Sequence, residues 1–122
     1  MTKEYNITFF YDPVTGGIPV KEYLNNVSDK ERAKILKYIE FLREHQGVLG
    51  EPYTKHIRDK IRELRVDFGK NRHRIFFFTF VGQNIILLHA FLKRTATTPQ
   101  LEITKALNNY YKVLNNRKLY ED

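Results

Sequence analysis

Two long apolar runs near the middle of the chain, at residues 74–80 and 84–92, place the strongest constraint on its fold. The first holds four phenylalanines and the second is mostly isoleucine and leucine, with Gly82 and Gln83 at the junction. Neither run alternates between apolar and polar residues, as a strand with one solvated face does. The sequence therefore predicts two paired central strands, each covered on both faces by other parts of the chain.

The segment before these strands predicts one further strand and two helices. Residues 5–11 are aromatic and β-branched and are followed by turn residues, a pattern typical of a strand. Pro19 suits the first turn of a helix that extends to about Asn26, because a proline there loses no hydrogen bond. Ser28 and Glu31 have the spacing of a capping box, so a second helix begins there and ends at Gly47. The two helices form a hairpin, and residues 47–52 form its exit loop.

The remaining elements complete an α+β pattern. From Ile61 onward a period of two appears, with charged and apolar side chains alternating over residues 63–68. This pattern predicts a strand that ends at a turn over residues 69–71. Thr98 is predicted to cap a terminal helix with Pro99 at its first position. Apolar residues then recur at helical spacing, at Ile103, Ala106, Leu107, Tyr110, Tyr111 and Leu114. We expect a single domain over residues 1–122, with an N-terminal strand and helical hairpin, an antiparallel β-meander and a C-terminal helix.

The composition excludes several classes of protein. The chain has 122 residues, of which 42% are hydrophobic, enough to build one core. It has no cysteine, which excludes disulfides, a thiol nucleophile, an iron–sulfur cluster and a zinc site with cysteine ligands. No basic region followed by a long apolar run opens the chain, and no apolar stretch reaches the ~18 residues of a membrane span. We therefore expect a soluble cytoplasmic protein that makes no contact with a membrane.

The positive charge is concentrated in one segment. Residues 55–74 hold eight basic and three acidic side chains, a net +5 of the +7 carried by the whole chain. Arginine matches phosphate oxygens with a planar fork of donors, so this segment suits a phosphate backbone. A solvated surface is the plain alternative, and composition alone does not separate the two. The predicted RNA-binding residues are Lys55, Arg62, Arg65, Lys70 and Arg72.

Basic residues also stand at the ends of predicted strands. Because the third strand begins beside the end of the fourth in an antiparallel meander, Arg74 is expected to face Lys93 and Arg94. Such a cluster suits cleavage of RNA by its own 2′-hydroxyl, since cations stabilise the charge on the pentavalent phosphate. His89 or a lysine of lowered pKa would move the protons. No metal and no cofactor is required.

The four histidines do not lie at the spacing of metal ligands, and no common catalytic motif is present. His89 lies in an otherwise apolar strand. For a lone histidine there, a core residue hydrogen-bonded to a backbone carbonyl is the favoured interpretation, and proton transfer is the alternative.

The chain resembles the phage-related HigB-like toxins of the RelE/ParE superfamily over residues 5–116. The similarity rests on Arg72-His73-Arg74-Ile75-Phe76-Phe77, on the pattern Leu-His-x-Phe-x-Lys-Arg-Thr-x-x-Thr-Pro at residues 88–99, and on Pro19-Val20-x-x-Tyr23-Leu24. The resemblance implies a RelE/ParE-like fold and the toxin of a type II toxin–antitoxin pair. It further implies a ribosome-dependent mRNA endonuclease, neutralised by a HigA-like helix-turn-helix antitoxin in a hetero-oligomer.

The resemblance also suggests roles for single residues. Arg74 matches the arginine that opens the third strand of the RelE-type enzymes, and Lys93 with Arg94 matches the basic end of the fourth. Arg65 falls on the preceding strand, where Glu63 is either a base or a neighbour of Arg65. The tyrosine that these enzymes carry after the last basic residue has no counterpart, because Gln100 stands there, which leaves His89 and Lys93 as its substitutes. The predicted catalytic residues are Arg74, His89, Lys93 and Arg94.

Two other functions remain open at this level. A ParE-like toxin would share the fold and poison gyrase without catalysis, and a non-catalytic RNA-binding module would use its charge only to hold phosphates. Catalysis by the predicted pocket requires that Arg74 and Arg94 face solvent or RNA. Replacing either with alanine is then expected to leave the stability nearly unchanged.

Overall fold

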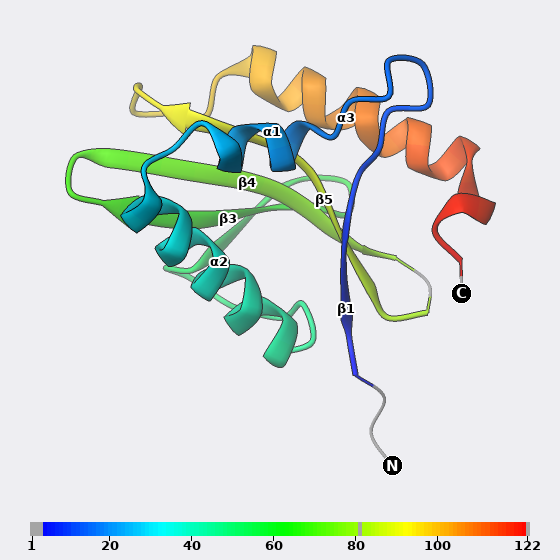
Figure 1. Cartoon of the computed structure of the whole chain (residues 1–122), viewed down its shortest axis with the longest axis horizontal. Helices are drawn as coiled ribbons and strands as arrows, with labels where there is room; N and C mark the ends of the chain where they lie inside the picture. Colours follow the sequence, from blue (N-terminus) through cyan, green and yellow to red (C-terminus); the bar gives the residue numbers. More distant parts are fainter. Residues whose placement is uncertain (1–3, 81, 122) are drawn as a thin grey trace.

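The computed structural model describes residues 4–80 and 82–121. A sheet separates a helical hairpin on one face from a long C-terminal helix on the other (Figure 1). The elements in chain order are β1 (Asn6–Phe9), α1 (Pro19–Asn25), α2 (Asp29–Glu44), β2 (Thr54–Arg58), β3 (Ile61–Phe68), β4 (Asn71–Phe80), β5 (Asn84–Lys93), α3 (Gln100–Asn115) and the short 3₁₀ helix η1 (Arg117–Leu119). The predicted α+β class and order of elements are confirmed, with one strand added.

The sheet has five strands in the order β1-β5-β4-β3-β2. Strands β2 to β5 form the predicted antiparallel meander, whereas β1 pairs in parallel with β5. Strand β1 is also shorter than the predicted 5–11. Strand β2 was not predicted, because four of its five residues are polar and its extended form comes from pairing with β3 at the sheet edge.

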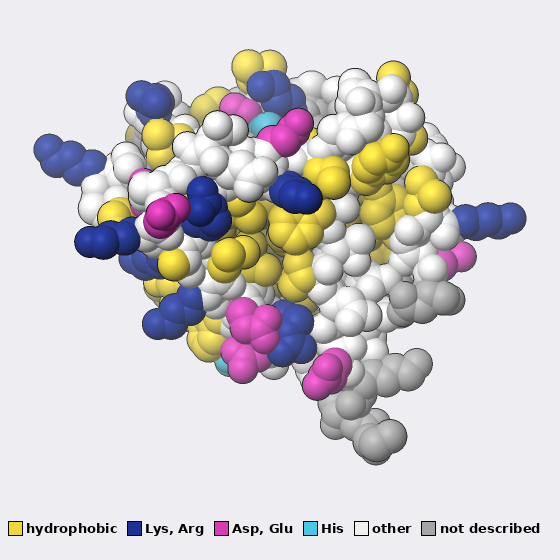
Figure 2. Space-filling view, viewed as in Figure 1, with side chains coloured by type: hydrophobic (Ala, Val, Ile, Leu, Met, Phe, Trp, Pro, Cys, Tyr) yellow, Lys and Arg dark blue, Asp and Glu magenta, His cyan; other side chains and the backbone are white. Residues whose placement is uncertain are grey.

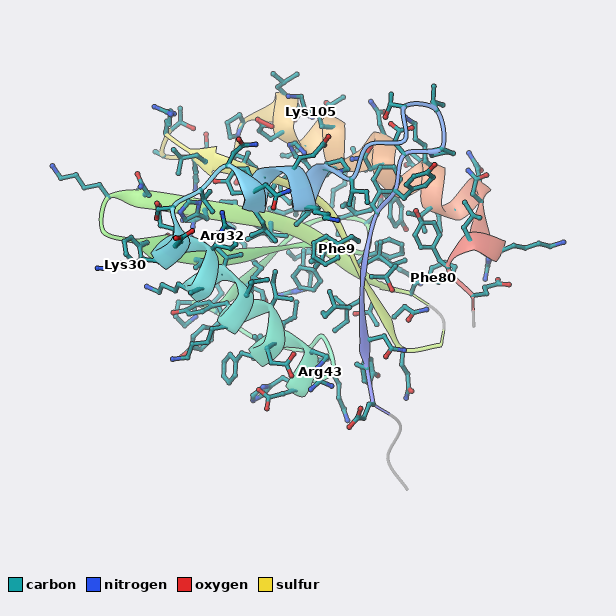
Figure 3. All side chains as sticks on the ribbon, viewed as in Figure 1. Phe9, Lys30, Arg32, Arg43, Phe80 and Lys105 are labelled. Atoms are coloured by element: carbon teal, nitrogen blue, oxygen red, sulfur yellow. The ribbon has the colours of Figure 1, made fainter. Side chains whose placement is uncertain are left out.

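The two apolar runs are the central strands and contribute to two cores. Toward α1 and α2, Phe77, Ile85 and Leu87 pack among buried residues of both helices. Toward α3, the core contains Phe76, Phe78, Ile86 and Leu88 with Tyr110 and Val113 of the helix. In Figure 3, Phe9 lies beside the first core and Phe80 lies near the C-terminal end of α3. The absence of alternation in these strands therefore reflects burial on both faces.

Short-range signals determine where α2 begins and ends. The Ser28 hydroxyl accepts a hydrogen bond from the Glu31 amide at 3.2 Å, which confirms Ser28 as the cap of α2, and it donates one to the Glu31 carboxylate at 2.7 Å. Gly47 follows the helix with φ of +75°, and a Cβ at this position would lie 2.5 Å from the Thr79 hydroxyl oxygen. Both the left-handed backbone and the close approach to β4 require glycine.

A β-bulge interrupts the pairing of the central strands. Phe76 lies opposite His89 but Phe77 lies opposite Leu87, so Leu88 is the extra residue. Because of this insertion, Leu88 belongs to the α3 core while the neighbouring His89 also stacks against Phe76 on that side. The bulge thus adds an imidazole to the α3 face of the sheet.

Candidate functional site

The strand register assembles three rows of mostly polar side chains on the α3 side of the sheet, near the first turn of α3. Residues that pair across strands point to the same face, and every second residue of a strand returns to it. From β2 or β3 toward β5, the rows are Lys55, Glu63, Phe76 and His89, then Arg65, Arg74 and Phe91, then Asp67, Arg72 and Lys93.

Arg74 and Glu63 form a buried ion pair at the centre of these rows. Arg74 Nε lies 3.8 Å from Glu63 Oε1, and the two side chains are 3% and 1% exposed. Arg74 Nη1 donates to Asp67 Oδ1 at 2.7 Å and to the carbonyl oxygen of His73 at 3.0 Å. The expectation that Arg74 faces solvent is therefore wrong, because two carboxylates and a carbonyl draw its guanidinium into the sheet.

Glu63 connects three segments. Among the described residues, Glu63 Oε1 and Arg74 Nε are the buried side-chain atoms without a hydrogen-bond partner, and they face each other across the ion pair. Glu63 Oε2 accepts from the Thr98 hydroxyl at 3.0 Å. Thr98 is consequently not the cap of α3 as predicted; Pro99 occupies that position without a side-chain hydrogen bond. Glu63 is buried and links β3, β4 and the loop before α3. A substrate cannot contact its carboxylate, so Glu63 does not act as a base.

Lys93 lies in the positive field of this cluster. Burial lowers the pKa of its ammonium group below the ordinary value, and the charges of Arg74, Arg65 and Lys55 lower it further, against the opposing effect of Glu63. An ammonium with a lowered pKa gives up its proton more readily than a surface lysine does.

A pocket of 440 Å³ opens between the β3–β4 turn and the end of β5. Its lining brings together Lys70, Arg72, Lys93 and Arg94, with Asn71 and Thr95 as polar neighbours. None of the described residues that line it is acidic. The β3–β4 turn lies at the left in Figure 1, and Lys and Arg side chains project on that side of the molecule in Figure 2. The register places Arg72, not Arg74, opposite Lys93, so the predicted facing of Arg74 and Lys93 is shifted by one row.

His89 is held by a carboxylate of α3. Its Nε2 lies 2.7 Å from Glu102 Oε1, and its side chain is 13% exposed. Burial lowers the pKa of the imidazole below its ordinary value, although the hydrogen bond to Glu102 acts in the opposite direction. The favoured prediction of a histidine satisfied by a backbone carbonyl is wrong, because α3 supplies a charged partner 13 residues away in the sequence.

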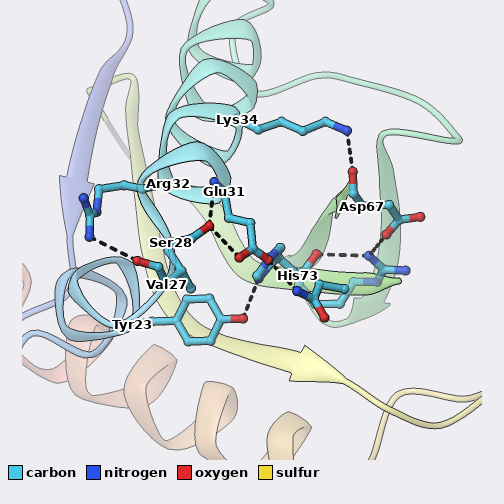
Figure 4. A network of polar contacts seen from close by, with 10 residues as sticks. Tyr23, Val27, Ser28, Glu31, Arg32, Lys34, Asp67 and His73 are labelled. Atoms are coloured by element: carbon cyan, nitrogen blue, oxygen red, sulfur yellow. Dashed lines mark hydrogen bonds and ion pairs between the residues drawn. The ribbon is translucent and has the colours of Figure 1, made fainter. Parts of the chain in front are cut away.

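A second polar network lies on the opposite face of β4 and was missed by sequence reasoning. The Tyr23 hydroxyl is 2.7 Å from His73 Nδ1, and His73 Nε2 is 2.7 Å from Glu31 Oε1 (Figure 4). Asn71 also donates to this carboxylate at 2.7 Å. Hydrogen bonds from Ser28, Asn71 and His73 lower the pKa of Glu31 to about 2, and burial raises that of Tyr23 to about 12. The capping-box glutamate was the one signal in the sequence that pointed to this network.

The predicted RNA-binding residues do not all lie on the same side of the sheet. Lys55 and Arg65 lie in the rows described above, and Lys70 and Arg72 line the pocket. Arg62 lies on the other face of β3, where its Nη2 donates to the Thr54 hydroxyl at 3.0 Å. It is therefore not brought together with the rest.

Over residues 4–80 and 82–121, no group of three or more histidine, aspartate or glutamate side chains is arranged to hold a metal ion. No helix in the same part of the chain is long and apolar enough to cross a membrane.

The fold and the site together define a small α+β protein with a cationic pocket beside a buried ion pair. Residues 22–111 match the family described as phage derived protein Gp49-like (DUF891), from within α1 to within α3. The match spans well over half of the chain, so the protein belongs to this family, which is generally regarded as a family of HigB-like toxins. No curated protein matches the chain significantly.

Proposed function

We propose that the protein is the toxin of a type II toxin–antitoxin pair and acts as a ribosome-dependent endonuclease on mRNA. The observation that carries the proposal is the pocket in which Lys70, Arg72, Lys93 and Arg94 meet without a carboxylate among its described lining residues. Like charges brought together repel one another unless an anion joins them, and RNA supplies anions at regular spacing. Membership of a family regarded as HigB-like toxins supports the same function.

The reaction that suits these side chains is transesterification by the RNA itself. The 2′-oxygen attacks the adjacent phosphorus and loses its proton to a base, while the bond to the 5′-oxygen breaks and that oxygen gains a proton. Lys93 and Arg94 stabilise the additional charge on the phosphate, and the lowered pKa of Lys93 suits it to protonate the leaving oxygen. The products are a 2′,3′-cyclic phosphate and a 5′-hydroxyl.

Arg74 has an indirect role in this mechanism. Its guanidinium is already bound to Asp67 and paired with Glu63, so it does not contact the phosphate. Instead it links β4 to β3 and adds to the positive potential around Lys93. Lys55 and Arg65, on the same face of the sheet, extend the cationic surface for neighbouring phosphates. The partners that this proposal includes are mRNA on the ribosome and an acidic HigA-like antitoxin.

The test is to incubate the purified protein with translating ribosomes and to map the ends of the mRNA. We expect 5′-hydroxyl ends. Because side chains alone carry the proposed chemistry, we expect cleavage to persist in EDTA once the ribosomes' own need for magnesium is controlled for, and also in any cleavage seen without ribosomes. Arg94→Ala is expected to lower the rate roughly a hundredfold, the effect of about 3 kcal/mol of lost transition-state stabilisation. Arg94→Lys restores part of it, since lysine provides charge without the fork of donors. Lys118→Ala, an exposed basic residue after α3, is the matched control.

Each other outcome points to a different function. Ends with a 5′-phosphate indicate water activated by a metal ion and contradict the mechanism. RNA binding without cleavage favours the non-catalytic module. Full toxicity of Arg94→Ala in cells, with gyrase inhibited, favours the ParE-like alternative.

A further inference from the structure

His89 is fixed in place on three sides. Its ring lies nearly parallel to those of Phe76 and Phe91, at interplanar angles of 25° and 14° and centroid distances of 6.2 and 6.1 Å. Its Nε2 meets the Glu102 carboxylate at 2.7 Å. Both phenylalanines are buried, so the ring orientation is defined by packing as well as by the hydrogen bond.

This contact determines which nitrogen of His89 carries the proton. An ionised carboxylate only accepts hydrogen bonds, so Nε2 must be the protonated nitrogen and Nδ1 keeps its lone pair. In the described part of the chain, no residue hydrogen-bonds to Nδ1, yet this atom is not among the buried atoms that lack a partner. Among the described residues Nδ1 therefore has no partner and is not fully buried, while the opposite nitrogen is bound to Glu102.

Glu102 lies near two positive groups, the N-terminus of α3 and Lys105. It stands in the first turn of α3, where the helix dipole stabilises negative charge, and Lys105 lies 3.8 Å from the same carboxylate oxygen. Lys105 projects from the outer side of α3 (Figure 3) and is about half exposed. The charged groups on the elements around His89 are Glu102 and Lys105 of α3, Lys93 of β5, Arg74 of β4, Glu63 of β3 and Lys55 of β2.

His89 and Lys93 lie on the same strand at a spacing that suits the attacking and the leaving oxygen of one phosphate group. The two residues are four positions apart on the same face of β5, which is about 14 Å at ~3.4 Å per residue. Phe91 lies between them, with Arg74 opposite it on β4. Both Phe91 and Arg74 are buried, so a phosphate shared by His89 and Lys93 must lie at the surface outside this middle row, with one residue on each side as an in-line displacement requires of its base and its acid.

We infer that Glu102 is a positioning residue that fixes His89 as the general base of the proposed reaction, an inference that rests on the proposed function. His89 Nδ1 takes the proton of the 2′-hydroxyl as the 2′-oxygen forms its bond to phosphorus. The bond from phosphorus to the 5′-oxygen breaks, and that oxygen takes a proton from the Lys93 ammonium. Glu102 exchanges no proton; it keeps the hydrogen on Nε2 and stabilises the imidazolium that forms.

The first measurement needs no RNA. Nitrogen chemical shifts of the imidazole distinguish its two tautomers, and we expect the wild-type His89 to carry its proton on Nε2. In Glu102→Gln the amide can donate to Nε2, so the proton moves to Nδ1 in part of the population, and the midpoint of the His89 titration falls to lower pH because a negative charge is lost. Wild-type protonation on Nδ1, or an unchanged tautomer and midpoint in Glu102→Gln, would overturn the positioning role.

The second measurement is the dependence of the cleavage rate on pH. For a base, the rate rises with pH through the pKa of the free imidazole. In Glu102→Gln we expect this rise at lower pH and a plateau at least tenfold lower, with part of the plateau restored in Glu102→Asp. Lys105→Gln is the matched control one turn along α3. Its plateau is unchanged and its rise moves slightly to higher pH, since Lys105 lowers the pKa of His89.

The outcomes separate this inference from the proposed function. If the wild type cleaves and Glu102→Gln keeps its plateau and pH profile while remaining folded, the pair only anchors α3 and the inference is wrong. If the wild type cleaves no RNA under any condition, the proposed function fails and the base role with it. The tautomer measurement decides the effect of Glu102 on His89 in either case.

Discussion

Arg74 and Glu63 are charged residues inside the sheet surface, and each compensates the charge of the other. Removing two charges from water is costly, and their attraction offsets this cost only while both are present. A buried carboxylate whose partner is removed therefore destabilises the protein more than the loss of the pair as a whole does. This argument reverses the expectation, drawn from strand ends, that Arg74→Ala leaves the stability unchanged.

We predict that Arg74→Ala lowers the free energy of unfolding by about 3–5 kcal/mol, the typical cost of leaving one buried charge unpaired. The double variant Arg74→Met with Glu63→Leu is expected to recover much of this loss. Urea unfolding at neutral pH measures both effects. Arg94→Ala, at an exposed position directly after β5, is the control and changes the stability by no more than about 0.5 kcal/mol. Equal stability of Arg74→Ala and Arg94→Ala would show that the buried pair contributes little.

At the scale of elements, the network of Tyr23, Ser28, Glu31 and His73 joins both helices of the hairpin to β4 (Figure 4). One residue, Glu31, accepts a hydrogen bond from the hydroxyl of Ser28, the cap of its own helix, and also accepts hydrogen bonds from the strand. Arg74 directly follows His73 in β4. The contact between Glu31 and His73 therefore helps the helical hairpin to position Arg74.

This network predicts a stability that depends on acid pH. The pKa of Glu31 is about 2 in the folded chain against 4.5 in its ordinary state, so its stabilising effect is complete above about pH 4.5 and is lost as the pH falls toward 2. Glu31→Gln is expected to be less stable than the wild type at pH 7 and to approach it as the pH falls through this window. Thermal unfolding across pH 2–7 measures the difference. Glu44→Gln, which removes one negative charge from the other end of α2, is the control, and a constant gap between Glu31→Gln and the wild type would contradict the prediction.

At the scale of the whole molecule, the net charge of +7 acts on partners before any contact forms. Long-range attraction is screened within about 8 Å at physiological ionic strength, so its effect on association depends on salt. Both proposed partners, mRNA and an acidic antitoxin, are negatively charged.

We predict that the rate of association with an acidic antitoxin falls steeply as salt is raised, while the dissociation rate changes less. Stopped-flow mixing over a range of salt concentrations measures this dependence. Charge reversal at Lys70 or Arg72 is expected to slow association. Lys118→Glu makes the same change in net charge beyond α3. If it slows association less than reversal at Lys70 or Arg72, the charges at the pocket contribute more to the association rate than charges elsewhere. An association rate that does not respond to salt would indicate that the charge serves RNA alone.

The sequence by itself determined the elements and most of their boundaries, because these depend on short-range patterns. The unbroken apolar runs identified β4 and β5, and the spacing of Ser28 and Glu31 located the start of α2. Strand β2 could not be predicted from the sequence, because an edge strand of polar residues has no such pattern. It becomes a strand by pairing with β3.

Only the tertiary structure decided the surroundings of the charged residues. The sequence placed Arg74, Lys93 and Arg94 near one another and wrongly predicted that Arg74 faces solvent. The pairing of β3 with β4 sets Arg74 beside Glu63 and Asp67, where it is buried. His89 meets Glu102 because a bulge and the packing of α3 bring them together. Periodicity along a chain encodes which face a side chain occupies, whereas its charge partners are set by contacts between strands and helices that no local pattern records.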